Sequence, residues 1–146
     1  MIRAIVLDSG PLGRLAHPRP NREIAEWYER HLRQGTVFII TEIADYELRR
    51  ELLRANLRES LTLLDAMGEA LVYASLTTAT IRRAAELWAQ VRNQGGPTAD
   101  DKALDADVIL AAQVESVRGE YDEVVVATEN VGHLARLAPA RDWKDI

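Results

Sequence analysis

The sequence of 146 residues contains no cysteine and only three histidines, which are His17, His31 and His133. Because cysteine is absent, disulfide bonds, thiolate nucleophiles and cysteine-ligated zinc sites are all excluded. The histidines stand far apart and do not form the H-E-x-x-H motif of zinc enzymes.

Long hydrophobic runs are missing as well. No apolar stretch approaches the roughly 20 residues that a membrane-spanning helix needs. The first residues also lack the basic and then apolar pattern of a secretion signal. We therefore expect a cytoplasmic protein with no membrane association.

Length and charge set two further limits. With 47% hydrophobic and 28% charged residues, the chain has the size and composition of one globular domain, expected to span residues 1–146. The formal net charge of −5 argues against a protein that coats nucleic acid by bulk electrostatics. It does not exclude a nuclease, because bound divalent cations can neutralise both the carboxylates of a site and an incoming phosphate.

The pattern of apolar residues predicts alternating strands and helices. Short apolar runs predict strands at 2–7, 36–40, 70–74 and 123–127, of which the last is the final clear strand. Apolar residues at helical spacing predict helices over 21–33, 42–58, 61–67, 78–93 and 99–117. This order predicts an α/β fold, a three-layer α/β/α sandwich with a mostly parallel central sheet.

Asp8 directly follows the first predicted strand, in the stretch A-I-V-L-D-S-G-P-L-G. Ligands of open parallel sheets bind beyond the carboxyl ends of the strands, which gives Asp8 a functional position. The alternative is that Asp8 only caps a turn, since Asp-Ser-Gly-Pro is typical turn sequence. This residue alone does not distinguish the two interpretations.

Glu47 lies about one turn into the helix that follows the second strand. That helix starts at the same edge of the sheet as Asp8, so Glu47 can face the same crevice. The alternative is an exposed side chain that pairs with Arg50 on the helix surface.

Two other acids of this helix have simpler interpretations. Glu42 stands at the predicted helix start, where the helix dipole favours an acid and Thr41 can serve as the N-cap. Asp45 stands four residues after Thr41, one too many for a capping box, and we expect it to be a solvated acid of the first turn.

Asp107 precedes five apolar residues, Val108 to Ala112, so its part of the helix should be buried on most sides. An unpaired buried carboxylate is costly and needs a proton or a partner. Asp100 shares a helical face with Asp107, whereas Asp105 lies on nearly the opposite face. If the helix instead begins near residue 104, Asp105 is free to turn inward, so it remains a second candidate.

These carboxylates come from separate segments and would repel one another in a common crevice. A divalent Mg²⁺ or Mn²⁺ ion takes oxygen ligands from a few carboxylates and leaves positions open for water and phosphate oxygens. Such an ion would remove the repulsion, activate a water molecule and stabilise the charge on a phosphodiester under attack.

Four segments of the chain together resemble the PIN-domain family, and in particular its small single-domain VapC-like members. The resemblance spans nearly the whole chain in the right order, and its most specific part is the pair of later segments. The segments are Asp8-Ser9, Glu47-Leu48-Arg49, Asp107-Val108-Ile109-Leu110-Ala111-Ala112 and Thr128-Glu129-Asn130-Val131-Gly132-His133-Leu134.

This resemblance implies an endoribonuclease that depends on Mg²⁺ or Mn²⁺ and hydrolyses RNA phosphodiester bonds. Asp8, Glu47 and Asp107 match the three acidic metal-site residues of the family. Asn130 stands where many members have a fourth acid, and Asp105 is a candidate metal ligand that would compensate for it. Catalytic roles are therefore implied for Asp8, Glu47, Asp107 and Asn130.

In VapC-like systems the enzyme is a toxin, usually a homodimer, which a small antitoxin protein inhibits. The resemblance implies the same partners here, with RNA as substrate. Two alternatives remain open, a stand-alone PIN nuclease in RNA processing and a non-catalytic PIN-like module that binds RNA or protein. For Thr128 and Asn130 the alternative is a turn that caps the following helix.

Several other residues are given structural interpretations. We expect the tryptophans to be core or interface anchors and His133 to be structural, since no second histidine lies near it in the sequence. A run of arginines could guide RNA phosphates toward the site, although a solvated helix face paired with Glu51 and Glu59 explains it more simply. The tryptophans are Trp27, Trp88 and Trp143, and the arginines are Arg49, Arg50, Arg54 and Arg58.

Overall fold

A computed structural model describes residues 1–95 and 101–146 of the chain, without the side chains of residues 101–103. Its centre is one sheet of five strands in the order β3-β2-β1-β4-β5, and all neighbouring pairs are parallel. The central strand β1 aligns Val6 with Ile39 of β2 and Val126 of β4. The strands are β1 (Arg3–Leu7), β2 (Val37–Thr41), β3 (Val72–Ala74), β4 (Glu123–Thr128) and β5 (Ala140–Asp142).

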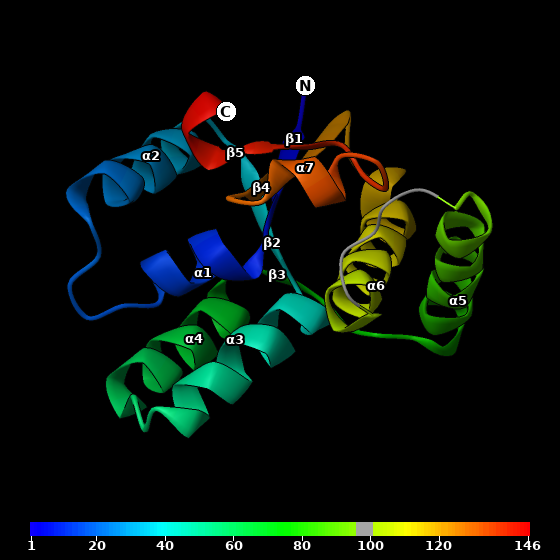
Figure 1. The fold of residues 1–146 in the computed structure, drawn as a ribbon. Helices are drawn as coiled ribbons and strands as arrows, with labels where there is room; N and C mark the ends of the chain where they lie inside the picture. The colour runs from blue at the N-terminus through cyan, green and yellow to red at the C-terminus, as the bar shows by residue number, and fades with distance from the viewer. Residues whose placement is uncertain (96–100) are drawn as a thin grey trace.

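Helices cover both faces of this sheet, which confirms the predicted three-layer sandwich (Figure 1). One face is covered by α1 (Ser9–Leu15), α2 (Arg22–Arg33), α3 (Glu42–Arg54) and α4 (Arg58–Ala70). The other face is covered mainly by α5 (Thr78–Asn93) and α6 (Asp101–Arg118). The short helix α7 (Val131–Leu134) follows β4, and a 3₁₀ turn, η1 (Trp143–Asp145), follows β5.

The side chains of the central strand β1 contribute to two separate hydrophobic cores. Ile5 and Leu7 pack against the α1–α4 layer, whereas Ala4 and Val6 pack against the α5–α6 layer, and all four are fully buried. Successive side chains of a strand point to opposite faces, so a nearly continuous apolar run is what a sheet covered on both sides requires. The strand predicted from this run is confirmed.

The helix predicted over 42–58 is wrong at its end, because the chain forms two helices there. Asn56 has a φ of 56°, in the left-handed region, and stops α3. The Leu57 N–H then donates to the Leu52 carbonyl over 2.9 Å, and the Asn56 N–H donates to the Leu53 carbonyl over 3.1 Å. This pair of bonds is a Schellman motif, which asparagine can form in place of glycine. Helix α4 therefore starts at Arg58, earlier than the predicted 61–67 helix.

Helix α1 and strand β5 were not predicted. The turn expected after Asp8 is the start of α1, whose N-cap is Asp8. Pro11 fits the first turn because its missing N–H would have no intrahelical partner there. The strand β5 has only three residues and lies beside β4, so the prediction that β4 is the last strand is wrong.

The remaining predicted elements agree closely with the structure. Asn21 is the N-cap of α2, and Gly35, with a φ of 82°, follows its end. Helix α5 has the predicted bounds, and the predicted start of the next helix at residue 99 lies outside the described residues. No helix within residues 1–95 and 101–146 has the length and apolar character needed to cross a membrane.

Candidate active site

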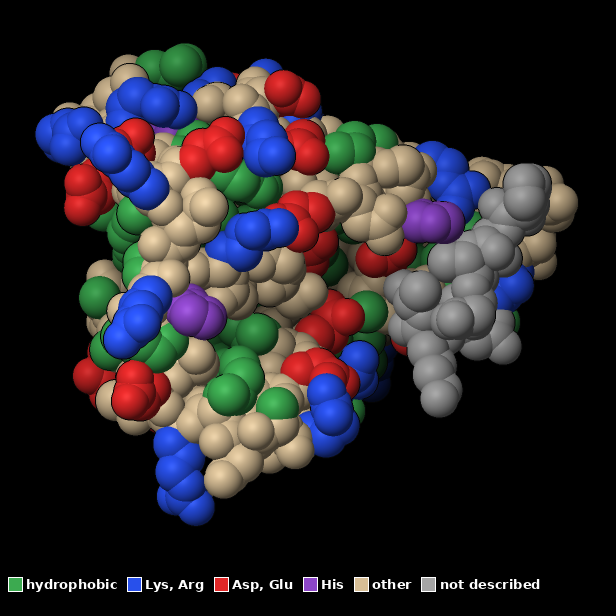
Figure 2. Space-filling view, turned by 60° about the vertical axis from the view of Figure 1, so that its left-hand side comes forward, with side chains coloured by type: hydrophobic (Ala, Val, Ile, Leu, Met, Phe, Trp, Pro, Cys, Tyr) green, Lys and Arg blue, Asp and Glu red, His purple; other side chains and the backbone are tan. Residues whose placement is uncertain are grey.

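The carboxyl ends of β1, β2 and β4 bring distant segments together at one edge of the sheet. Because β1 lies between β2 and β4, the residue after β1, the start of α3 and the end of β4 meet there. Acidic side chains gather around a hollow on one face of the molecule (Figure 2). A pocket of about 310 Å³ at this edge is lined by Asp8, Ser9, Gly10, Glu47, Ala106, Asp107, Thr128, Glu129 and Asn130.

The structure therefore brings four of the predicted site residues to one pocket, namely Asp8, Glu47, Asp107 and Asn130. Each comes from a different segment, with Asp8 after β1, Glu47 on α3, Asp107 on α6 and Asn130 before α7. The exposed-pair interpretation of Glu47 does not describe its position, because its side chain lines the pocket and is partly buried.

Asp8 is held by two hydrogen bonds, one to each carboxylate oxygen. Its Oδ1 accepts from the Ser9 N–H over 2.9 Å, and its Oδ2 accepts from the Thr128 hydroxyl over 2.8 Å. The Thr128 oxygen in turn accepts from the Asn130 N–H over 3.0 Å. The capping and functional interpretations of Asp8 are thus compatible, since one carboxylate caps α1 and also faces the pocket.

The pKa values of two pocket acids are raised. The pKa of Glu47 is raised to about 7, mainly by burial and also by the charges of Asp8 and Asp107, while Arg50 opposes the rise. Burial likewise raises the pKa of Asp107 to about 6, together with the Asp8 charge and against the positive charges of His133 and Arg136. The pocket thus holds carboxylates that lack compensation for their charge, as acids of a functional site often do.

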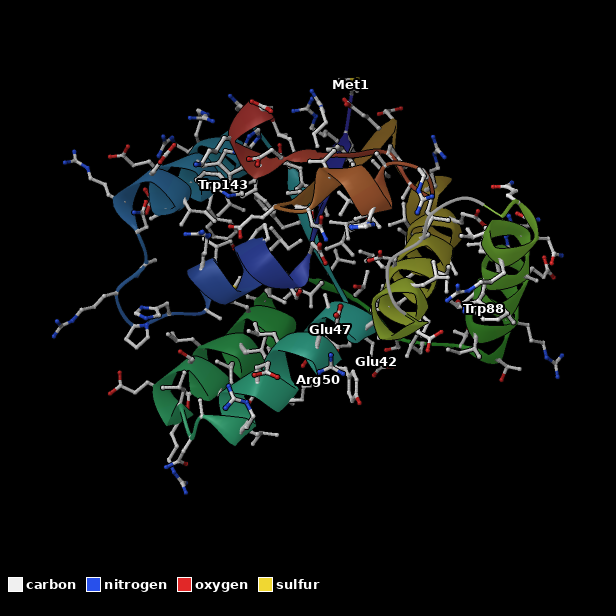
Figure 3. The ribbon with its side chains drawn as sticks, viewed as in Figure 1. Met1, Glu42, Glu47, Arg50, Trp88 and Trp143 are labelled. Atoms are coloured by element: carbon white, nitrogen blue, oxygen red, sulfur yellow. The ribbon has the colours of Figure 1, made fainter. Side chains whose placement is uncertain are left out.

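Arg50, three residues after Glu47 on α3, is a positive charge that lowers the pKa of Glu47. Both side chains extend from the middle part of α3 (Figure 3). The Arg50 guanidinium lies over the Tyr46 ring, 5.1 Å from its centroid. Among the ion pairs of the described residues, none joins Arg50 to Glu47. Glu47 therefore keeps a raised pKa although an arginine lies one turn away.

Asp105 does not reach this pocket. Its exposed side chain lines a different, mainly apolar hollow between α5 and α6, with Ile81, Trp88 and Val108. The reason is helical geometry, since α6 already runs through residue 105 and turns it away from Asp107. The other candidate on this segment, Asp100, lies outside the described residues.

The end of β4 also places an acid that the sequence did not reveal. Glu129 lines the pocket, and its Oε2 lies 3.2 Å from where a Cβ on Gly10 would stand. Arg14 of α1 forms an ion pair with it. No role was predicted for Glu129, and the only signal in the sequence was its place between Thr128 and Asn130.

Asn130 occupies the N-cap position of α7, with its side chain exposed. Within the described part of the chain, that side chain makes no capping hydrogen bond to α7. The hydroxyl of Thr128 accepts from the Asn130 N–H over 3.0 Å and so fixes the turn before α7. The Asn130 amide is therefore available to the pocket that it lines.

The prediction that Asp45 is a solvated acid of the first turn is wrong. It is 7% exposed and accepts from Arg49 Nε over 2.8 Å and from the Tyr73 hydroxyl over 2.8 Å. Arg49 also pairs with Asp65 of α4 over 2.8 Å, so one cation joins two helices. Burial and the Asp45 hydrogen bond raise the pKa of Tyr73, which keeps its hydroxyl protonated as a donor. This network attaches α3 to α4 and β3.

The first turn of α3 is fixed by its own acid and by the predicted N-cap. The Thr41 hydroxyl accepts from the Ala44 N–H over 3.4 Å, which confirms the cap. Glu42 does more than complement the helix dipole, because its carboxylate accepts from the Leu76 N–H over 2.8 Å. The start of α3 is thus bound to the segment after β3.

The tryptophans and the remaining arginines have mostly structural positions. Trp27 and Trp143 are buried core residues, as predicted. Their rings meet edge to face, with 5.7 Å between the centroids. Trp88 is 37% exposed, beside the hollow between α5 and α6. Arg54 pairs with Glu51 on the surface of α3, in accordance with a solvated face.

The donor set of the pocket fits a hydrated divalent cation. Among the described residues, no group of three or more His, Cys, Asp or Glu side chains is arranged so as to hold a metal ion. Mg²⁺ keeps several water ligands and often takes only one or two carboxylates from the protein. The 310 Å³ pocket has three carboxylates, and two of them have raised pKa values. One or two of these carboxylates are enough for an ion that keeps most of its water ligands.

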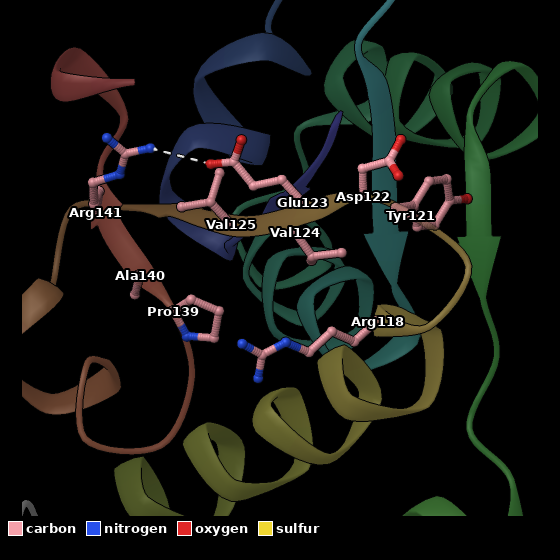
Figure 4. A pocket seen from close by; sticks show the side chains of 9 residues that line it. All are labelled: Arg118, Tyr121, Asp122, Glu123, Val124, Val125, Pro139, Ala140 and Arg141. Carbon is pink, nitrogen blue, oxygen red and sulfur yellow. Dashed lines mark ion pairs between the residues drawn. The ribbon is translucent and has the colours of Figure 1, made fainter. Parts of the chain in front are cut away.

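Another hollow, of about 550 Å³, lies beside the amino-terminal half of β4, away from these acids (Figure 4). Its carboxylates already have structural partners, since Asp122 accepts from the Ile2 N–H and Glu123 pairs with Arg3 and Arg141. Ligands of parallel sheets bind at the opposite, carboxyl ends. The acidic pocket is therefore the better candidate for the active site.

The chain therefore has an α/β/α sandwich fold with an acidic pocket at the carboxyl edge of its parallel sheet. No family model and no curated protein matches the sequence. Solved structures do match, and a chain of VapBC2 from Rickettsia felis, bound to a fragment of promoter DNA, superposes with a TM-score of 0.73 at 14% identity. That alignment covers 98% of this chain and 99% of the other.

Two further structures agree. A chain of the DNA-bound VapBC from Salmonella typhimurium gives a TM-score of 0.72 at 19% identity, again covering 98% of this chain and 99% of the other. A chain of FitAcB from Neisseria gonorrhoeae gives 0.67 at 16% identity over 97% and 99%. At such identities the likeness shows the fold, and it confirms the PIN-like sandwich that the sequence resemblance implied.

Proposed function

We propose that this protein is an endoribonuclease that depends on Mg²⁺ or Mn²⁺, and that it acts as a VapC-like toxin. The observation that carries the proposal is the convergence of Asp8, Glu47 and Asp107 on one pocket at the carboxyl edge of the sheet. Their mutual repulsion and partial burial raise two pKa values, a cost that a bound cation would offset.

In this proposal the cation would lie among Asp8, Glu47 and Asp107, bound directly by one or two of these carboxylates and through water molecules by the rest. When bound, a divalent ion supplies activation of water and stabilisation of the charge on a phosphodiester. Thr128 keeps the Asp8 carboxylate oriented through its hydroxyl. The Asn130 amide, which lines the same pocket, can orient a water molecule or a phosphate oxygen by donating a hydrogen bond.

The partners follow from the resemblance and from the neighbouring folds. The similar solved structures are VapBC and FitAcB assemblies, which supports a small antitoxin as the regulator of this protein. RNA is the proposed substrate, and a homodimer is the proposed assembly. A non-catalytic PIN-like module is the second candidate, favoured by the neutral Asn130 in place of a fourth acid.

The test is cleavage of a mixed pool of structured RNAs by the purified protein, with Mn²⁺ or Mg²⁺ against EDTA. Asp107→Asn and Asp105→Asn form a matched pair, because both remove an acid from α6 and only Asp107 lines the pocket. We expect metal-dependent cleavage that Asp8→Asn, Glu47→Gln and Asp107→Asn abolish and Asp105→Asn retains. Cleavage that survives in EDTA or in Glu47→Gln would contradict the proposal.

A further inference from the structure

Gln113 is a polar residue buried in the middle of an apolar helix. It is 1% exposed, on α6, and follows Ala111 and Ala112, which are equally buried. A buried amide without partners is costly, so its hydrogen bonds show what it stabilises. Its two polar atoms bind two different elements, neither of which is its own helix.

The side-chain oxygen of Gln113 accepts from the Ile43 N–H, in the first turn of α3, over 3.2 Å. Its nitrogen donates to the carbonyl of Ala74, the last residue of β3, over 2.7 Å. The backbone partners fix the orientation of the amide, since an N–H requires the oxygen and a carbonyl requires the nitrogen. One side chain thus connects α6, the start of α3 and the end of β3.

Two of these contacts lie on the helices that carry Glu47 and Asp107, two acids of the pocket. Ile43 and Glu47 are four residues apart on α3, so they share one face of that helix. Asp107 and Gln113 are six residues apart on α6, about 9 Å along the helix axis. The bond between Gln113 and Ile43 therefore joins the helix that carries Asp107 to the face of α3 that carries Glu47.

We propose that Gln113 is a positioning residue of the acidic pocket, which sets the separation of the Glu47 and Asp107 carboxylates by holding the start of α3 against α6. The inference rests on the proposed metal site. No other side chain of this length offers both an acceptor and a donor without a charge. Methionine would fill the space and leave the Ile43 N–H and the Ala74 carbonyl unpaired.

The experiment measures Mn²⁺ affinity by titration calorimetry on the purified protein without RNA. The variant is Gln113→Met, which keeps an unbranched side chain of similar size. The control is Thr80→Val on α5, because Thr80 is 5% exposed and its hydroxyl, among the residues that the structure describes, bonds only at its own helix start, to Thr77 over 2.8 Å. Thermal unfolding of both variants shows how far each one is destabilised.

We expect Gln113→Met to weaken Mn²⁺ binding about tenfold, and Thr80→Val to leave it within twofold at a comparable loss of thermal stability. Gln113→Asn retains the amide on a shorter stem and should give an intermediate loss, which also covers the case in which Gln113→Met does not fold. Equal effects of Gln113→Met and Thr80→Val would reduce Gln113 to a structural residue. A wild-type protein that binds no Mn²⁺ would instead contradict the proposed function itself.

Discussion

The hydroxyl of Thr128 donates a hydrogen bond to Asp8 over 2.8 Å and so joins the carboxyl ends of the neighbouring strands β4 and β1. Thr128 is fully buried, and the same oxygen accepts from the Asn130 N–H. One hydroxyl therefore connects an acid of the pocket to the loop that carries Asn130. This arrangement leads to the first prediction.

Thr128→Val should weaken Mn²⁺ binding and RNA cleavage by roughly tenfold. Valine keeps the shape of threonine but removes the donor to Asp8, and a hydrogen bond to a charged group is worth about 1.5–3 kcal/mol. Thr128→Ser is the matched control, because it keeps the hydroxyl. Calorimetric titration with Mn²⁺ measures the difference, and equal affinity in the two variants would mean that Asp8 is held without Thr128.

The stability of the metal-free protein should fall as the pH rises from about 4 to 8. The pKa values of Glu47 and Asp107 in the folded protein, about 7 and about 6, lie above their ordinary values of 4.5 and 3.8. Their protonated forms are therefore favoured by folding, and this stabilisation is fully present below pH 4 and is lost as the pH rises through 6 and 7.

The matched variant for this effect is Glu47→Gln, which cannot ionise. Glu47 is partly solvated, so water screens its charge, and we expect about 1 kcal/mol of added stability for the variant at pH 8 and none at pH 4. Urea denaturation of both proteins in EDTA, at several pH values, measures it. A variant that is less stable than the wild type at pH 8 would show that the pocket tolerates the Glu47 charge.

Affinity for Mn²⁺ should depend on pH in the opposite sense. A cation binds the deprotonated carboxylates, so protons compete with it below the pKa values of about 7 and 6 for Glu47 and Asp107. Between pH 8 and pH 5.5 we expect affinity to fall by at least tenfold. The thermal shift at fixed Mn²⁺ should shrink in parallel, because stabilisation by a ligand follows its occupancy. A flat profile over this range would place the cation away from these acids.

The ion pair of Asp45 should contribute strongly to stability, in contrast to the surface pairs of the same helix. Asp45→Asn removes one of the two acidic partners of Arg49, at a site where Asp45 is 7% exposed, and loss of one member of a buried pair costs about 3–5 kcal/mol. We expect about 3 kcal/mol here, since Asp65 still faces Arg49. Glu51→Gln is the control, because the exposed pair of Glu51 with Arg54 is worth under about 1 kcal/mol. Denaturant unfolding of both variants measures the contrast, and similar losses would contradict it.

Much of the fold and of the pocket could be predicted because apolar runs and acids after strands leave a local signal. The strand before Asp8 and the helix that carries Glu47 have such patterns. The network of Asp45 could not be predicted, because Tyr73 and Asp65 reach it only after α4 and β3 have packed. Capping rules describe an isolated helix, and tertiary contacts decided the burial of Asp45.

The other differences between the predictions and the structure have related causes. The left-handed Asn56 is one of few residues able to stop a helix without glycine, and the sequence around it contains no proline to mark the boundary. Helix α1 was hidden because Asp-Ser-Gly-Pro suits a turn as well as a helix start. The position of Glu129 in the pocket depends on α1, so it could not be predicted while α1 was missed.

Glu129 provides the last prediction, which concerns its ion pair with Arg14 at the rim of the pocket. Arg14 neutralises an acid that would otherwise add to the negative charge around Asp8. Arg14→Ala should therefore free Glu129 for the cation and strengthen Mn²⁺ binding about threefold. In the Glu129→Gln background, the same Arg14 substitution should have no such effect, because the carboxylate that Arg14 neutralises is gone. Mn²⁺ titrations of the two single variants and the double variant measure this coupling. Weaker binding in Arg14→Ala would mean that Arg14 supports the pocket by holding the loop after β4 in place, and that its charge does not compete with the cation.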